Sequence, residues 1–382
     1  MSGNITRRGK SSWRLKFEAA EHDPSTGKRR TRFVTVRGTK KDAQRELIRL
    51  LGEVERGTAV DPSKATLAEY LRGWLDTDPD LSPKTLERYR QLAEQQIIPH
   101  LGSTLLQKLR PAQVHDWHAT LLIAGGRAGR ALSARTVGHA HRVLRRGLER
   151  ALRLEMVGRN VAAALHPPKV ERTEVEILSA EQIADVLARL EGHTLHPIVA
   201  LALGSGMRRG EICGLAWGEL DLDDRAVVRI ERSLEETDAG LRFKLPKTRA
   251  GRRTVSLPIN VVDTLRVHRR EQMARRLLLG LGRPGAADLV FTLPDGSPYP
   301  PDKLSRDWGN VVRDKKLPRV MFHALRHSHA SALIAAGLDV VAVSRRIGHA
   351  SPAITLTVYA HLFQSKDTAA AAAIEAAMRP RR

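Results

Sequence analysis

Six side chains in the C-terminal half of this 382-residue chain have the chemistry needed to act on a phosphate group. They are Arg208, Lys247, His323, Arg326, His349 and Tyr359, with Glu211 as a candidate supporting residue. Guanidinium groups can grip the charge that develops on phosphoryl oxygens with paired hydrogen bonds, which suits Arg better than Lys. A tyrosine hydroxyl can act as a nucleophile and form a covalent intermediate. The set therefore indicates phosphoryl transfer.

The spacing of four of these residues places them on shared helix faces. Arg208 lies at a predicted helix start, three residues before Glu211, so one turn can present both side chains on one side. His323 and Arg326 are also three residues apart and share a face in the same way. Each pair alone is common in proteins, so neither identifies a function by itself.

The other three residues complete an ordered pattern. Lys247 lies in a Leu-Pro-Lys-Thr-Arg segment before a predicted strand, which places it in a β-hairpin turn, and Tyr359 follows Gly348-His349 by ten residues. Taken together and in this order, the motifs resemble the tyrosine recombinase family, also called phage-type integrases. The segments that follow Arg208 and precede His349 resemble the family as well.

The resemblance covers the chain unevenly. It is close over residues 177–365. Residues 66–165 resemble the family's helical core-binding domain by architecture more than by motif. Residues 1–56 resemble the small arm-type DNA-binding domain of lambda-like and transposon integrases.

The resemblance assigns a role to each candidate residue. Tyr359 would attack DNA and form a 3′-phosphotyrosyl bond, releasing a 5′ hydroxyl that Lys247 would protonate. His323 would assist proton transfer at the Tyr359 hydroxyl, and His349 would hydrogen-bond a phosphate oxygen. The bond energy is conserved in the intermediate, so rejoining needs no ATP. No metal and no other cofactor is expected.

Some positions depart from the family pattern or allow a second interpretation. The family commonly has Asp after the first His of His-x-x-Arg, whereas this chain has Ala324. Glu211 could instead form an ordinary surface ion pair. His323 and His327 have a zinc-compatible spacing, but the metalloprotease Glu is absent. We therefore expect His327 and His329 to pack within the helix and support the site.

The N-terminal segment is expected to form a three-stranded sheet packed on one helix. Residues 12–17 and 30–36 alternate apolar and basic side chains with the period of a strand. Trp13, Leu15, Phe17 and Phe33 are predicted to share one face, opposite Arg and Lys. Thr39 and the residues after it favour a helix to about Arg56.

The whole chain is therefore predicted to be multidomain α+β. An arm-type DNA-binding domain (residues 1–56) is followed by an all-α core-binding domain (66–165) and a mainly α catalytic domain with a small antiparallel sheet (177–382). Helix starts are predicted near Thr66, Pro83, Pro111 and Ser133. A short terminal helix is predicted over residues 369–378 and is expected to dock on a neighbouring protomer. The alternatives are a helix folded back on its own domain and a frayed tail.

Charge points to a nucleic-acid partner. The net charge is +22, and it is spread along the chain as +8, +7 and +7 over residues 1–60, 61–173 and 174–382. A polyanion such as DNA is therefore a natural partner for every segment.

The single cysteine excludes a disulfide framework within the chain. No membrane span and a cytoplasmic location are expected.

The predicted function is site-specific integration, and also excision, of a phage or mobile genetic element. Expected partners are core and arm DNA sites, three further copies in a tetramer, an excision or directionality factor, and a host DNA-bending protein. An Xer-type chromosome or plasmid dimer-resolving recombinase is the first alternative, and residues 1–56 argue against it because that group usually lacks such a segment. A non-catalytic DNA-binding architectural protein is the second, and the complete residue set argues against it.

Overall fold

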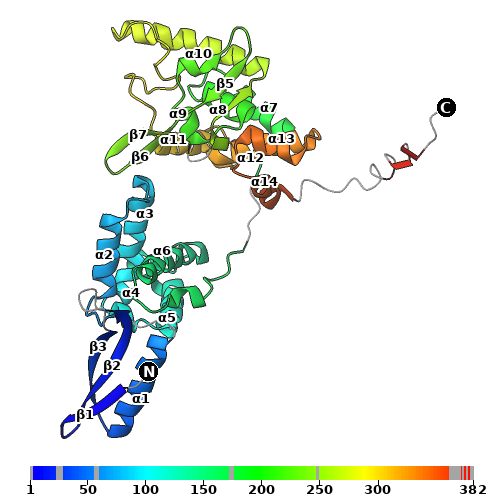
Figure 1. Ribbon diagram of the computed structural model, residues 1–382. Coiled ribbons are helices and arrows are strands. Elements are labelled where there is room, and N and C mark those ends of the chain that lie inside the picture. Colours follow the sequence, from blue (N-terminus) through cyan, green and yellow to red (C-terminus); the bar gives the residue numbers. More distant parts are fainter. Residues whose placement is uncertain are drawn as a thin grey trace. The chain divides into compact units, whose positions relative to one another are not determined.

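The computed structural model describes residues 3–22, 29–55, 60–171, 176–246 and 249–360, together with 371, 374, 375, 377 and 378 near the C-terminus. The chain divides into two compact units, Met1–Arg172 and Thr173–Arg382. Lys247 and most of the predicted terminal helix over 369–378 lie outside the described residues. The two units are described separately below (Figure 1).

The first unit begins with an antiparallel sheet in the order β1-β2-β3, followed by α1. Its elements are β1 (Gly3–Gly9), β2 (Ser12–His22), β3 (Arg29–Arg37) and α1 (Lys40–Glu55). Leu15 and Phe17 of the sheet are buried against Leu47 and other apolar residues of α1. Reciprocal hydrogen bonds between Thr39 and Asp42 begin this helix, which confirms the predicted start.

The predicted position of Phe33 is wrong. Its cross-strand partner in β3 and β2 is Lys16, whereas Val34 pairs with Leu15. Paired residues lie on the same face of a sheet, so Phe33 belongs to the basic face and its side chain is 52% exposed. The Arg14 guanidinium lies 4.1 Å from the centre of its ring, a favourable cation–π arrangement.

The rest of the first unit is helical, as predicted. The helices are α2 (Leu67–Thr77), α3 (Pro83–Leu92), α4 (Ile98–Leu101), α5 (Pro111–Ala124) and α6 (Ala134–Arg153), with a π-helical turn (Ala93–Ile97) between α3 and α4. Thr66 and Ser133 accept hydrogen bonds from the first turns of α2 and α6. The core, which includes Leu71, Trp74 and Leu144, is separate from the core under the N-terminal sheet.

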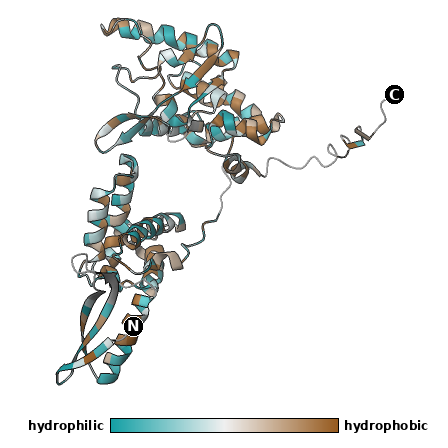
Figure 2. Cartoon of the chain, viewed as in Figure 1, coloured by the Kyte–Doolittle hydropathy of each residue, from teal (hydrophilic) through white to brown (hydrophobic). Residues whose placement is uncertain are grey.

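The second unit carries all the candidate catalytic residues. Its helices are α7 (Ala180–Arg189), α8 (His196–Ser205), α9 (Arg209–Cys213), α10 (Ile259–Leu278), α11 (Pro301–Asp314), α12 (Phe322–Ala335), α13 (Val340–Ile347) and α14 (Pro352–Tyr359). Most helices in Figure 2 carry both teal and brown, as expected for elements that bury one side only. The central helix α8 is almost fully buried.

The strands of this unit pair differently from the prediction. They are β4 (Leu220–Asp221), β5 (Val227–Ile230), β6 (Ser233–Thr237), β7 (Gly240–Lys244) and β8 (Arg253–Ser256). One sheet has the order β4-β5-β8, while β7 pairs with β6. The strands on either side of Lys247, β7 and β8, therefore do not form one hairpin. Leu289 forms only an isolated antiparallel bridge, with Ala216.

Candidate active site

The candidate residues lie at the ends of helices in the second unit. Arg208 caps the start of α9, and His323 and Arg326 lie in the first turns of α12. His349 follows the C-terminus of α13, and Tyr359 is the last residue of α14. Contacts between α12 and α13 and between α13 and α14 hold these helix ends together.

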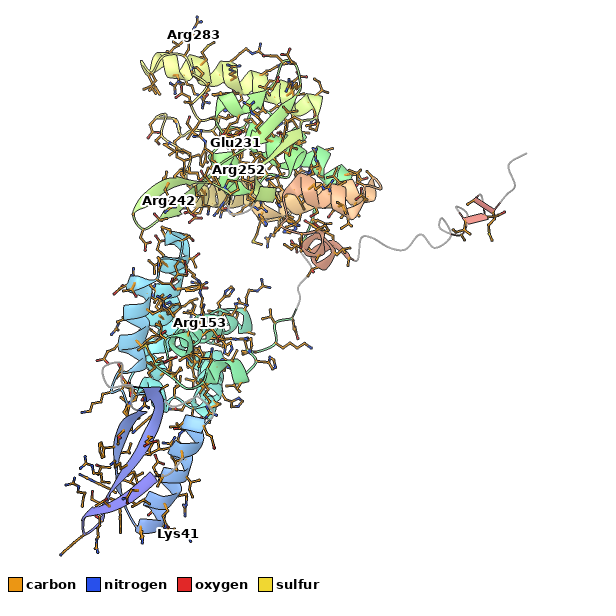
Figure 3. All side chains as sticks on the ribbon, in the orientation of Figure 1. Lys41, Arg153, Glu231, Arg242, Arg252 and Arg283 are labelled. Atoms are coloured by element: carbon orange, nitrogen blue, oxygen red, sulfur yellow. The ribbon has the colours of Figure 1, made fainter. Side chains whose placement is uncertain are left out.

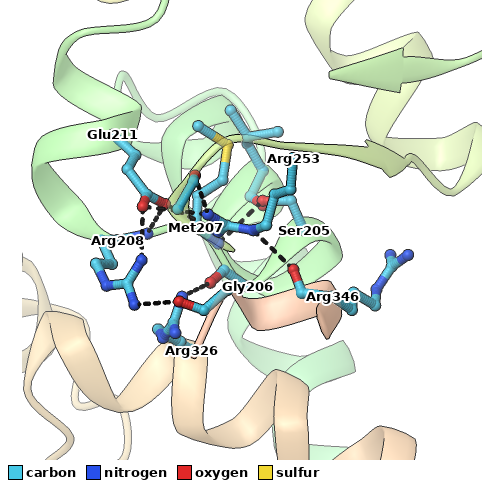
Figure 4. Close-up of polar contacts among 11 residues, drawn as sticks. Ser205, Gly206, Met207, Arg208, Glu211, Arg253, Arg326 and Arg346 are labelled. Atoms are coloured by element: carbon cyan, nitrogen blue, oxygen red, sulfur yellow. Dashed lines mark hydrogen bonds and ion pairs between the residues drawn. The ribbon is translucent and has the colours of Figure 1, made fainter. Parts of the chain in front are cut away.

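Glu211 is at the centre of a buried charge network (Figure 4). Its carboxylate accepts hydrogen bonds from Arg208 Nη1 at 2.8 Å and from Arg253 Nη2 at 3.0 Å, and its side chain is only 4% exposed. Burial alone would raise the pKa of Glu211, but the hydrogen bond and charge of Arg253, and then those of Arg208, hold it below its ordinary value. Glu211 is therefore an ionised buried anchor for two guanidinium groups and not a surface ion pair.

Arg326 is buried with unused hydrogen-bonding capacity. Its Nη1 donates to the Gly206 carbonyl at 2.7 Å. Its Nη2 is also buried but has no hydrogen-bond partner within the described residues. Burial, and then the charge of Arg208, lowers the pKa of Arg326 to about 9. An anion bound here would accept a hydrogen bond from Nη2 and balance the surrounding positive charge.

Two glycines allow the arginines to reach these positions. Gly206 has φ +66° and Gly348 has φ +68°, a left-handed conformation that ends α8 and α13. The carbonyl of Gly206 binds Arg326, and that of Gly348 accepts a 2.7 Å hydrogen bond from Arg208 Nη2. A Cβ at Gly206 would lie 2.6 Å from His329 Cδ2. The residue after each helix is thus both a backbone cap and a ligand for a site arginine.

Tyr359 is buried and its hydroxyl contacts a histidine. The distance from Tyr359 Oη to His327 Nδ1 is 2.6 Å. Burial raises the pKa of Tyr359 to about 12, although the charge of Arg326 opposes this shift. The phenol is therefore protonated at neutral pH, and a base must remove its proton before the oxygen can attack.

The contact from His327 was not predicted. In the described part of the chain, the imidazole nitrogen bonded to the Tyr359 hydroxyl belongs to His327, whereas His323 is exposed and meets His327 edge to face at 5.1 Å. The residue directly follows Arg326, and it shares a helix face with His323. This spacing could have marked His327 as a site residue.

His349 is half-buried beside the same cluster. Its Nδ1 lies 2.9 Å from Thr355 Oγ1. Burial, reinforced by the charges of Arg326 and Arg208, lowers the pKa of His349 to about 4. A neutral imidazole at this place can present its other nitrogen, Nε2, as a hydrogen-bond donor.

His329 and two further arginines hold the surrounding backbone. His329 Nδ1 donates to the Leu203 carbonyl at 2.6 Å, and its Nε2 accepts from Arg346 at 3.1 Å. Arg346 also donates to the carbonyls of Gly204 and Ser256. Arg253 donates to the Arg346 carbonyl at 2.8 Å. His329 thus packs in α12 and supports the site as predicted, whereas no motif pointed to Arg253 or Arg346.

No metal-binding cluster is evident across the described residues, because nowhere in them do three or more His, Cys, Asp or Glu side chains gather in a way that could hold an ion. In the same part of the chain, every helix falls short of the length and hydrophobicity that a membrane crossing requires. The chemistry available at the site is that of guanidinium, imidazole and phenol groups.

Comparison with known protein families gives two matches along the chain. Residues 176–366 match the Phage integrase family, and residues 66–122 match the family described as Phage integrase, N-terminal SAM-like domain. The first match includes every candidate residue of the site, and the second falls on the helical part of the first unit.

Individual proteins also resemble the chain over most of its length. An integrase of Streptomyces ambofaciens is 30% identical over 360 residues, covering 88% of this chain and 86% of the relative. A protein named tyrosine recombinase XerC-like, from Caldanaerobacter subterraneus subsp. tengcongensis, is 25% identical over 350 residues, with 86% and 88% covered. A structure of the Tn1549 transposon integrase with a circular intermediate DNA has a TM-score of 0.67 at 21% identity, covering 81% of this chain and 99% of that one.

Proposed function

The chain belongs to the phage integrase family and is a site-specific tyrosine recombinase that integrates mobile genetic elements, and we propose that it cuts and rejoins DNA through a covalent bond between Tyr359 and a 3′ phosphate. The observation that carries this proposal is the contact of a buried tyrosine hydroxyl with the His327 imidazole, beside a buried arginine whose Nη2 has no hydrogen-bond partner in the described part of the chain.

We assign each site residue a role, and for Lys247, which lies outside the described residues, the role rests on the family resemblance alone. Arg208 and Arg326 bind the non-bridging oxygens of the scissile phosphate and stabilise the charge that develops there. The Tyr359 oxygen attacks phosphorus, and the bond to the 5′ oxygen breaks. Lys247 supplies the proton that this oxygen takes up, and His349 donates a hydrogen bond to a phosphate oxygen. Glu211 keeps Arg208 in position.

Double-stranded DNA is the proposed substrate for every part of the chain. Basic side chains are spread over both units, and Lys41, Arg153, Arg242, Arg252 and Arg283 mark their distribution in Figure 3. We assign residues 66–165 and 177–382 to the core site, and residues 1–56 to distal arm sites. The exposed Phe33 with Arg14 above it gives the sheet a basic, aromatic face suited to a DNA groove.

Recombination between two sites requires several protomers. We propose a tetramer on paired core sites, with a directionality factor for excision and a host DNA-bending protein as accessory partners. A solved lambda integrase tetramer bound to a Holliday junction, which resembles this chain with a TM-score of 0.55, supports this assembly. The separate N-terminal core supports an independent arm-binding role.

A nicked half-site that traps the cleaved strand tests the cleavage step. The wild-type protein is expected to form a covalent DNA adduct, and Tyr359→Phe is expected to form none while binding DNA almost normally, since only the attacking oxygen is lost. An adduct of normal yield with Tyr359→Phe would assign the nucleophile to another residue.

An Xer-type dimer-resolving role is the second candidate because one relative is named XerC-like. Recombination assays with paired DNA sites separate the two roles. An integrase joins two different attachment sites and depends on arm sequences, whereas a resolving recombinase acts on two like core sites without them.

A further inference from the structure

His327 is placed to act on the reacting oxygen of the proposed nucleophile. Its Nδ1 is 2.6 Å from Tyr359 Oη, and the two ring centres are 5.7 Å apart. The contact joins α12 to α14, and the two residues are 32 positions apart in the sequence. A distance of this size is that of a short hydrogen bond between the phenol and the imidazole.

The surroundings of His327 disfavour a second ring proton. Arg326 is the next residue of α12, His323 lies one turn earlier with its ring 5.1 Å away, and His349 is a further imidazole of the same site. Tyr359 is neutral and supplies no negative charge to balance a cation. Burial, and then the charge of Arg326, lowers the pKa of His327 below its ordinary value. The resting ring is therefore neutral and one of its nitrogens carries a free lone pair.

We propose that His327 is the general base that takes the proton from the Tyr359 hydroxyl, an inference that rests on the proposed nucleophilic role of Tyr359. In the resting site the phenol donates to Nδ1, and the ring proton is on Nε2. As the tyrosine oxygen bonds to phosphorus, its proton moves to Nδ1 and the ring becomes an imidazolium. The bond to the 5′ oxygen breaks, and that oxygen receives its own proton from a separate donor, Lys247.

The same residue serves the reverse step. When the 5′ hydroxyl of a DNA strand attacks the phosphotyrosine, the Tyr359 oxygen leaves and takes back the proton held on Nδ1. Two different groups then transfer protons: His327 at the Tyr359 oxygen and Lys247 at the 5′ oxygen. His323, exposed and without a contact to the hydroxyl in the described residues, remains available to bind phosphate.

The pH dependence of adduct formation tests this role. Single-turnover cleavage of the nicked half-site is measured from about pH 6 to 9 for the wild type, His327→Asn and His323→Asn. Asn keeps a hydrogen-bonding group near the phenol but cannot take its proton. Above about pH 7 the wild-type rate is expected to be nearly flat, because the pKa of His327 lies below its ordinary value and the ring is neutral there. The His327→Asn rate is expected to be roughly 10²–10⁴ lower at neutral pH and to rise about tenfold per pH unit, because only the tyrosinate then attacks.

The controls separate this inference from the proposed function. Added imidazole is expected to recover part of the His327→Asn rate, and His323→Asn is expected to keep the flat wild-type profile. A flat profile and near-normal rate for His327→Asn, or the steep profile in His323→Asn instead, would overturn the assignment. Absence of any Tyr359-dependent adduct in the wild type would instead reject the proposed function. Equal melting temperatures of the variants verify that they fold.

Discussion

At the scale of single residues, the site is a cluster of positive charge built in advance for an anion. Three arginines lie around the Glu211 carboxylate: Arg208, Arg253 and Arg326. Arg208 and Arg253 donate hydrogen bonds to it. Arg326 Nη2 has no hydrogen-bond partner in the described structure. Fixed donors of this kind stabilise a transition state because they need no rearrangement when charge develops.

Removing either phosphate-binding arginine is expected to slow cleavage strongly. Arg208→Ala and Arg326→Ala should each lower the single-turnover rate of adduct formation by roughly 10²–10³, the scale of losing one donor to a developing charge. Arg266→Ala is the matched control, because that arginine belongs to α10 and forms an exposed ion pair with Asp263. An unchanged rate for Arg208→Ala or Arg326→Ala would exclude that arginine from the site.

Replacing Glu211 should cost stability as well as activity. Glu211→Gln leaves Arg253, whose side chain is 7% exposed, without its countercharge, so the free energy of unfolding should fall by roughly 3–5 kcal/mol. The control Asp302→Asn breaks an exposed ion pair with Arg209 and should cost about 0–1 kcal/mol. Denaturant titration of both variants measures the difference. Equal losses would mean that Glu211 does not act as a buried anchor.

At the scale of elements, helix ends determine where the reactive groups lie. Gly206 ends α8, and its carbonyl and left-handed backbone bring Arg326 and the α9 cap together. Gly348 does the same for α13 and Arg208. Small changes in these turns would move charged groups relative to Tyr359, and positioning errors of this size are costly in catalysis.

An alanine at Gly206 is expected to disturb both folding and cleavage. The residue has φ +66°, and the added Cβ would lie 2.6 Å from His329 Cδ2, so Gly206→Ala should lower the free energy of unfolding by roughly 1–3 kcal/mol. Gly309→Ala is the matched control, because that exposed glycine of α11 has no atom within 4 Å of an added Cβ. It should leave stability unchanged or raise it by up to about 1 kcal/mol. Comparable destabilisation by both would argue against a special backbone at Gly206.

Local patterns predicted the helices, whereas pairing between distant segments was harder to predict. Capping residues such as Thr66 and Ser133 act within one turn, so the sequence shows where α2 and α6 begin. Strand pairing depends on partners far along the chain. For this reason the sequence did not predict that β7 pairs with β6, or that Phe33 lies on the basic face of its sheet. The contact of His327 with Tyr359 is equally non-local. Motif order therefore suggested the candidate residues, and only the three-dimensional structure showed that the His327 imidazole contacts the Tyr359 hydroxyl.

At the scale of the whole molecule, the chain combines a catalytic unit with smaller modules that have their own cores. The N-terminal sheet and α1 enclose one apolar cluster, and the helices α2–α6 enclose another. Polar contacts such as the Arg32–Asp61 ion pair connect the sheet to the segment that follows it. Separate cores support our proposal that the modules bind separate stretches of DNA.

Deleting residues 1–56 is expected to separate cleavage from integration. The shortened protein should bind and cleave a core site at a near-normal rate, because the apolar clusters of the remaining parts are intact. It should lose binding to distal sites, and the slope of log affinity against log salt should become shallower as phosphate contacts are removed. Mobility-shift titrations at several salt concentrations measure this slope. Integration at full efficiency by the shortened protein would contradict the arm-binding assignment.

Identifying the residue that becomes attached to DNA tests the proposed role of Tyr359 most directly. After the reaction with a nicked half-site in EDTA and without nucleotide, nuclease and protease digestion followed by tandem mass spectrometry locates the modified peptide. We predict a single adduct in which Tyr359 carries a nucleotide through its 3′ phosphate. An adduct on any other residue, a 5′ linkage, or cleavage that requires added metal would contradict a metal-free mechanism in which Tyr359 forms a 3′-phosphotyrosyl bond.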